Sequence, residues 1–224
     1  MSSRFLVMSI ALASAMFVTA SGSDAHACGG EWFPIMRIDP RIHGVAQAEK
    51  ALNGGKIADA GASVVRMIPH IKTLDGTKSA LIARAERVLA LSLARGDGAL
   101  ANDLAIPREV QNTWLGKTPA LRAANLEWAV GVLQRQSDKK QDDPAMLTDL
   151  AETMAKVDAQ RPRAREILEK LAARDLVATP QGYKALAELR RQAGDAKGEH
   201  VALERCRALA GKSVETSCNN VARG

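Results

Sequence analysis

Histidine side chains are the first candidates for catalysis or metal binding, because their ring nitrogens act as acid, base and ligand near neutral pH. Three of the four histidines, His43, His70 and His200, follow the apolar N-terminal segment. His200 and Glu204 are four residues apart, so they would share one face of a helix. The sequence has no further His or Cys at ligand spacing and no His-Glu-x-x-His motif. We therefore expect an exposed helix pair here and no metal ligands.

The sequence also lacks the motifs of nucleophilic and phosphate chemistry. It has no Gly-x-Ser-x-Gly, no Ser-x-x-Lys after a strand and no phosphate-binding loop. The glycine-containing stretches Gly54-Gly55 and Gly96-Asp97-Gly98 are expected to end helices. Asp142-Asp143 come just before Pro144 at an expected helix start, where negative charge is favourable, and Glu152 follows in the same segment. We expect neither enzymatic activity nor a cofactor; a hydrolase on a helical scaffold is a weaker alternative.

Three cysteines, Cys28, Cys206 and Cys218, give the most specific chemical expectation. Cysteines of an exported protein are expected to pair, and an odd number leaves one over. A bridge from Cys206 in the last expected helix to Cys218 would hold the tail, residues 212–224, against that helix. Closing this loop would stabilise the fold by roughly 2–3 kcal/mol. We predict this bridge; a free, buried Cys206 or a bridge from Cys28 to either of the others are the alternatives.

Residues 1–27 have the three parts of a secretory signal peptide. These are a positive charge at Arg4, an apolar run at residues 5–20 and a small-x-small sequence at residues 25–27. A membrane anchor is less favoured, because Ser9, Ser14 and Thr19 interrupt the run, which is shorter than the ~20 apolar residues of a span. We predict export to the bacterial periplasm or cell envelope.

Cys28 directly follows the predicted cleavage site. Bacterial lipoprotein signals resemble Leu-(Ala/Ser)-(Gly/Ala)-Cys close behind the apolar run. Ala25 and Ala27 are compatible with that pattern, but His26 and the seven residues between Ala20 and Cys28 are not. Ordinary cleavage after Ala27 explains these residues better. Lipidation of Cys28 is the alternative, and a membrane is an expected partner only in that case.

The composition favours an all-α fold. Hydrophobic residues make up 46% of the chain but aromatic residues only 3%, and alanine and leucine dominate. These residues and the abundant Arg, Glu and Lys are strong helix formers, whereas the alternating Val, Ile and Thr of strands are almost absent. The net charge of +6 is spread along the chain instead of forming one basic stripe with aromatic residues, so we expect no nucleic-acid partner.

Helical periodicity predicts consecutive pairs of antiparallel helices. One pair spans residues 45–71 and turns at Gly54-Gly55, and the last pair starts with Thr179 as N-cap and Pro180, then turns at Gly194-Asp195. Residues 144–177 form another pair with Arg161-Pro162 at the joint. Single helices are expected within 78–98 and within 118–136, with two short ones around Pro107 and a polar loop at 137–144.

These helix pairs resemble tetratricopeptide repeats, which place small residues where the helices face each other and a Gly or Asp at the turn. The matching residues are Ala48, Gly55, Ala60 and Val64 in the first pair, Ala151, Ala164 and Leu168 in the pair at residues 144–177, and Ala187, Gly194 and Leu203 in the last pair. The resemblance implies a short α-solenoid of about nine or ten helices over residues 42–211, after an extended segment, 28–41. Such folds present a concave groove that binds a peptide or a protein.

The aromatic residues are candidate contacts for that partner. Trp32 and Phe33 either cover the open face of the first helix pair or act as an exposed anchor. Trp114, Trp128 and Tyr183 lie in expected helices and are interpreted as core residues, with a groove as the alternative. The expected function is an exported protein- or peptide-binding scaffold; the alternative is an outer-membrane lipoprotein of an envelope assembly, anchored through Cys28.

The mass of the chain recovered from a bacterial envelope tests the N-terminal prediction. We expect a chain that starts at Cys28 and carries no lipid, because the residues before Cys28 match a signal-peptidase site better than a lipoprotein signal. A mass increase equal to a diacylglycerol group on Cys28 would instead support the lipoprotein alternative.

Overall fold

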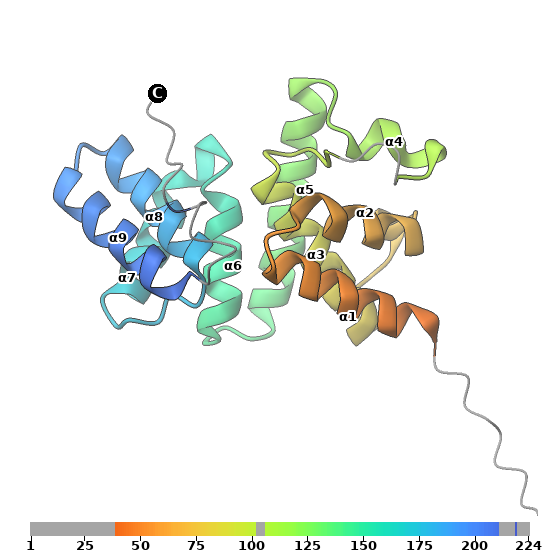
Figure 1. The fold of residues 1–224 in the computed structure, drawn as a ribbon, viewed down its shortest axis with the longest axis horizontal. Helices are drawn as coiled ribbons and strands as arrows, with labels where there is room; N and C mark the ends of the chain where they lie inside the picture. Colours follow the sequence, from red (N-terminus) through yellow and green to blue (C-terminus); the bar gives the residue numbers. More distant parts are fainter. Residues whose placement is uncertain (1–38, 102–105, 211–217, 219–224) are drawn as a thin grey trace, which may run out of the picture. The chain divides into compact units, whose positions relative to one another are not determined.

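A computed structural model describes residues 39–101, 106–210 and 218, and the helices belong to one compact unit. The described residues form nine α-helices, two short 3-10 helices and no strand, so the predicted all-α class is confirmed (Figure 1). The α-helices are α1 Pro40–Asn53, α2 Ile57–Met67, α3 Ala80–Arg95, α4 Arg108–Trp114, α5 Pro119–Asp138, α6 Pro144–Met154, α7 Arg161–Ala172, α8 Pro180–Gln192 and α9 Ala196–Leu209; the 3-10 helices are η1 Ile71–Thr73 and η3 Asp158–Gln160.

Several N-terminal predictions fall outside the described residues: the signal peptide, Cys28, Trp32 and Phe33. The helical part begins before the expected residue 42, because the first helix already contains Pro40 and Arg41, which were assigned to the extended segment 28–41. One of the two short helices expected around Pro107 is α4; the other would fall mainly on residues 102–105, which are also outside the described part. Within that part, no helix is long and apolar enough to cross a membrane.

Short polar side chains and glycines determine where the helices begin and turn. Thr118 and Thr179 accept hydrogen bonds from backbone N–H groups three residues ahead, as N-caps do, and each is followed by a proline. Gly55 and Gly194 have φ values of 78° and 77°, a conformation that glycine adopts without steric cost. These two glycines make the tight turns inside the first and last helix pairs.

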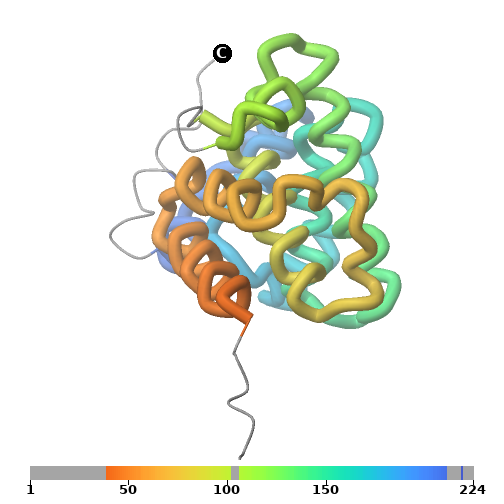
Figure 2. The backbone as a smooth tube through the Cα atoms, turned by 90° about the vertical axis from the view of Figure 1, so that its right-hand side faces the viewer, coloured from red at the N-terminus to blue at the C-terminus, as the bar shows by residue number. Residues whose placement is uncertain are grey.

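Consecutive helices pack as pairs, and the pairs pack in sequence order. The pairs are α1 with α2, α3 with α5, α6 with α7, and α8 with α9, while α4 is inserted between α3 and α5 and packs on α5. Helices α1, α3, α6 and α8 also contact one another in that order, as can be followed by colour in Figure 2. The first helix of each pair therefore contributes to one continuous row.

Small residues sit where the helices cross. Ala48, Ala60, Ala151, Ala164 and Ala187 are all at most 1% exposed, and they are the positions at which small residues were expected to face a partner helix. These alanines and larger residues, several of them leucines, belong to one buried core cluster. Side chains this small let helix axes approach closely and pack without voids.

The predicted bridge between Cys206 and Cys218 is present. Both cysteines are fully buried, and 12 positions separate them in the sequence. The bridge attaches Cys218, beyond the end of α9, to the inner side of that helix. Cys206 is therefore not free, and neither Cys206 nor Cys218 is bridged to Cys28.

Removing the bridge should lower the free energy of unfolding by about 2–3 kcal/mol, because the unfolded chain gains conformational freedom. The double variant Cys206→Ala, Cys218→Ala can be compared with the wild type by chemical denaturation without reductant. Adding a reductant should bring the wild type to the stability of the variant and leave the variant unchanged. Equal stability of the two proteins before reduction would contradict the prediction.

Candidate functional site

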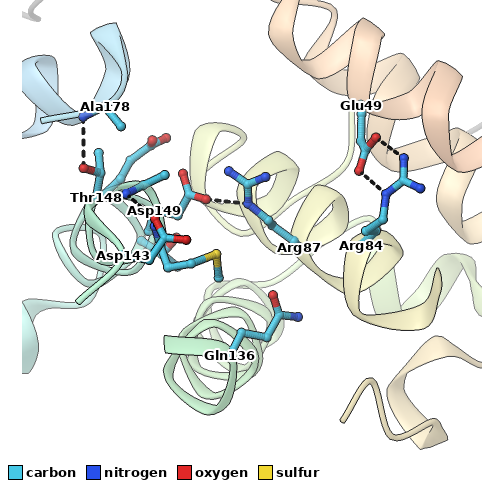
Figure 3. Close-up of polar contacts among 12 residues, drawn as sticks. Glu49, Arg84, Arg87, Gln136, Asp143, Thr148, Asp149 and Ala178 are labelled. Atoms are coloured by element: carbon cyan, nitrogen blue, oxygen red, sulfur yellow. Dashed lines mark hydrogen bonds and ion pairs between the residues drawn. The ribbon is translucent and has the colours of Figure 1, made fainter. Parts of the chain in front are cut away.

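Three arginines of α3 pair with carboxylates of the neighbouring helices α1 and α6. Figure 3 shows two of these pairs, Arg84 with Glu49 and Arg87 with Asp149. Arg84 binds both oxygens of Glu49 on α1, with N–O distances of 2.8 and 2.5 Å. Arg87 donates from Nε to Asp149 Oδ2 at 2.6 Å. These pairs connect the first two helix pairs to each other and to α6.

The third pair, Arg95 with Glu152, is the most enclosed. Their side chains are 10% and 5% exposed, and the guanidinium binds both carboxylate oxygens, at 2.7 and 3.1 Å. Burial alone would lower the pKa of Arg95, but the charge of Glu152 and its hydrogen bonds outweigh burial and raise it. Arg95 therefore keeps its charge, and each of the two oxygens of Glu152 accepts one hydrogen bond from it.

A pocket of about 220 Å³ lies against this row of ion pairs. Helices α1, α3 and α6 and the N-cap of α8 supply its walls. The apolar residues are Leu52, Val88 and Leu91; the polar residues are Glu49, Asn53, Arg87, Arg95, Asp149 and Thr179. Thr179 is positioned through α6, because the backbone N–H of its neighbour Ala178 donates to Thr148 Oγ1 at 3.1 Å (Figure 3).

Asp149 is the unusual group of the pocket. Its side chain is 1% exposed, and its Oδ1 has no hydrogen-bond partner among the described residues. Burial raises the pKa of Asp149 to about 6, although the positive charge and hydrogen bond of Arg87 act in the opposite direction. A buried carboxylate oxygen without a partner is costly, and protonation relieves that cost.

Arg87 provides the free donors of the pocket. Its side chain is 39% exposed, and only its Nε is engaged, so Nη1 and Nη2 have no partner within the described part of the chain. A guanidinium edge with two free nitrogens matches the geometry of a carboxylate. The site can therefore bind an anionic or hydrogen-bond-accepting group.

The aromatic residues Trp114, Trp128 and Tyr183 lie away from this pocket. Trp114 is 1% exposed and meets the half-buried Trp128 edge-on, with ring centroids 5.4 Å apart. Lys72 Nζ lies 4.5 Å from the Trp114 centroid and donates to Asn125 Oδ1 at 3.0 Å. Tyr183 is buried and donates to a carboxylate oxygen of Asp175. None of the three aromatic residues lines the pocket described above.

The three histidines of the described residues lie on different elements. His200 and Glu204 form an exposed pair on α9, 3.2 Å apart, as their spacing predicted. His43 lies beside Gln47 on the exposed side of α1, and His70 precedes η1. The described residues contain no group of three or more His, Cys, Asp or Glu that could hold a metal ion.

Sequence reasoning missed Arg87 and Asp149 as a site. The available signal was a set of charged residues inside otherwise apolar helices: Asp149 and Glu152 fall within "MLTDLAETM", and Arg87 and Arg95 within "RAERVLALSLAR". Charges on a buried face are rare unless they are paired. The sequence could have indicated buried ion pairs, but not which residues pair.

No protein-family model matches the chain, and neither does a curated protein or a solved structure. The functional argument therefore depends on the geometry of the site.

The stability of the chain should depend on pH through Asp149. Since the folded chain holds the Asp149 proton more tightly than the unfolded chain, the stabilisation from protonated Asp149 is complete below about pH 4 and is lost as the pH rises through about 6. Relative to Asp149→Asn, the wild type should lose up to about 3 kcal/mol over this range and no more above it. Denaturant unfolding of both proteins at several pH values measures the difference.

The exposed Asp142 offers a matched control. Asp142→Asn should follow the wild type at every pH. A constant difference between wild type and Asp149→Asn from pH 4 to 7.5 would show that Asp149 is not perturbed.

Proposed function

We propose that the chain is an exported module that binds a peptide or a segment of another protein in the pocket between α1, α3 and α6. The observation that carries the proposal is the free Nη1 and Nη2 edge of Arg87, presented in a mostly polar pocket beside three apolar side chains of the first helices. Fixed polar groups in a binding site set the orientation of the ligand.

The size of the pocket favours a peptide over a metabolite. Small-molecule sites usually measure roughly 300–1,000 Å³ and enclose most of the ligand, whereas this pocket measures about 220 Å³. It would accept one side chain or the end of a chain, with the rest of the partner lying along the row of helices. Peptide recognition by a row of helices is a common use of such folds.

The resemblance to tetratricopeptide repeats gives independent support. The small residues expected at helix crossings are buried, and the two glycines expected at turns have positive φ values. We propose on this basis that the stacked pairs form a short α-solenoid of this type. Since folds of this kind serve many ligands, the proposed function depends on the pocket more than on the resemblance.

We further propose that the chain works in the periplasm or cell envelope. The signal-like residues 1–27 support export, and the bridge between Cys206 and Cys218 is compatible with an oxidising compartment. Because that bridge uses two of the three cysteines, Cys28 is available for a lipid anchor. An outer-membrane lipoprotein of an envelope assembly is therefore the second form of the proposal.

Selection from a phage-displayed random peptide library against the purified chain tests the proposed function. We expect selected peptides to bind wild type and to lose at least tenfold in affinity to the double variant Arg87→Gln, Asp149→Asn, which removes the free donors without leaving a buried charge. Arg108→Gln, an exposed arginine of α4, is the matched control and should bind as wild type does. Failure to select any peptide, or equal binding by the double variant, would contradict the proposal.

A further inference from the structure

The charges around the pocket balance only while Asp149 is ionised. Arg84, Arg87 and Arg95 of α3 face three carboxylates: Glu49 of α1, and Asp149 and Glu152 of α6. The N-cap of α8, Thr179, is uncharged, and no described residue of α5 or α7 lines the pocket. The six charges therefore sum to zero, and one proton on Asp149 would leave an excess of one positive charge.

That excess would belong to Arg87. Glu49 is bound through both oxygens by Arg84, and Glu152 is bound through both oxygens by Arg95. When Asp149 is neutral, Arg87 has no charged hydrogen-bond partner among the described residues, and Glu49 acts on it through its charge alone. A carboxylate of a ligand would supply the missing hydrogen-bonded counter-charge.

The hydrogen-bond geometry allows the proton to be gained without rearrangement. Asp149 Oδ2 accepts from Arg87 Nε, whereas Oδ1 is buried and has no partner among the described residues. A proton on Oδ1 therefore leaves the bond at Oδ2 in place. The two free nitrogens of Arg87 keep their position, and only the charge behind them changes.

From this geometry we propose that the pocket is a carboxylate-binding site controlled by acid, in which protonation of Asp149 leaves Arg87 without a charged hydrogen-bond partner and so available to a carboxylate of the partner. This inference rests on the proposed function and adds the ligand chemistry and its regulation. An ionised Asp149 lies close behind the guanidinium and repels a bound carboxylate, and its neutralisation removes that repulsion. The N-terminal end of α8 at Thr179 adds a weaker attraction for negative charge.

The range of the response follows from burial of the Asp149 side chain, which raises its pKa to about 6. Binding should strengthen on mild acidification, between about pH 7.5 and 5.5, while ordinary Glu side chains and chain termini remain ionised. The histidines titrate in the same range, but none of His43, His70 and His200 lines the pocket.

Short peptides distinguish the chemistry and its source. The probes are acetyl-Ala-Glu-Ala-amide, which carries a side-chain carboxylate, acetyl-Ala-Ala-Ala with a free C-terminal carboxylate, and acetyl-Ala-Gln-Ala-amide, which carries none. Binding to the full chain is followed by NMR at pH 7.5 and 5.5 through the backbone amide signals of the pocket residues in every variant, and also through the Arg87 Nε–H signal where Arg87 is present. The titration of the Asp149 carboxyl carbon is recorded in the same samples.

We expect at least one carboxylate peptide to bind the wild type roughly tenfold more tightly at pH 5.5, as the Coulomb energy of a nearby like charge suggests. The peptide that responds identifies the source of the carboxylate, and the neutral peptide should show no pH response. Asp149→Asn should bind the responding peptide tightly at both pH values. The double variant Arg87→Gln, Asp149→Asn should lose binding, and Asp142→Asn should resemble the wild type.

Three results would overturn the inference. These are an Asp149 carboxyl that titrates near pH 4, wild-type affinity that is the same at both pH values, and pH dependence that persists in Asp149→Asn. Any of them leaves the proposed function standing if library peptides still bind through Arg87. Loss of all peptide binding, including that of library peptides, would instead contradict the proposed function itself.

Discussion

The arrangement of the described helices depends on α3, whose arginines are shared between its neighbours. Arg84 connects α3 to α1, while Arg87 and Arg95 connect it to α6. The Arg95–Glu152 pair is nearly enclosed, so loss of either partner would leave a buried charge without compensation. Apolar packing supplies most of the stability of such a core, but it is not directional. The ion pairs add directional contacts between α3 and the helices beside it.

The chemistry of the pocket results from a difference in how many carboxylate oxygens are hydrogen-bonded in each ion pair. Glu49 and Glu152 are each bound through two oxygens, whereas Asp149 is bound through one. The same position therefore combines an under-bonded acid with an arginine that keeps two free nitrogens. If Asp149 were also bound through both oxygens, the row of ion pairs would have a structural role alone. The incomplete pair gives the surface a chemically distinct point.

Local features of the fold could be predicted from the sequence, because they depend on neighbouring residues. Thr179 and Pro180 start α8, the turn at Gly194 joins α8 to α9, and Cys206 reaches a cysteine 12 positions away. The site could not be predicted in this way. Arg87 and Asp149 are 62 positions apart, and Arg95 and Glu152 are 57 apart. Periodicity shows that these residues lie on buried helix faces, but the stacking of separate helix pairs decides which charges meet.

The bridge at the end of α9 makes the two ends of the row of helices different. Each pair contacts mainly its neighbours, so opening is expected to spread from an end inward. The bridge between Cys206 and Cys218 fastens the segment after α9 onto that helix, whereas the described residues hold no such cross-link at α1 and α2. Fraying should therefore start at the N-terminal pair, next to the wall of the pocket that α1 provides. The part of the chain that contacts a ligand would be the part that loosens first, and an occupied pocket would hold that end closed.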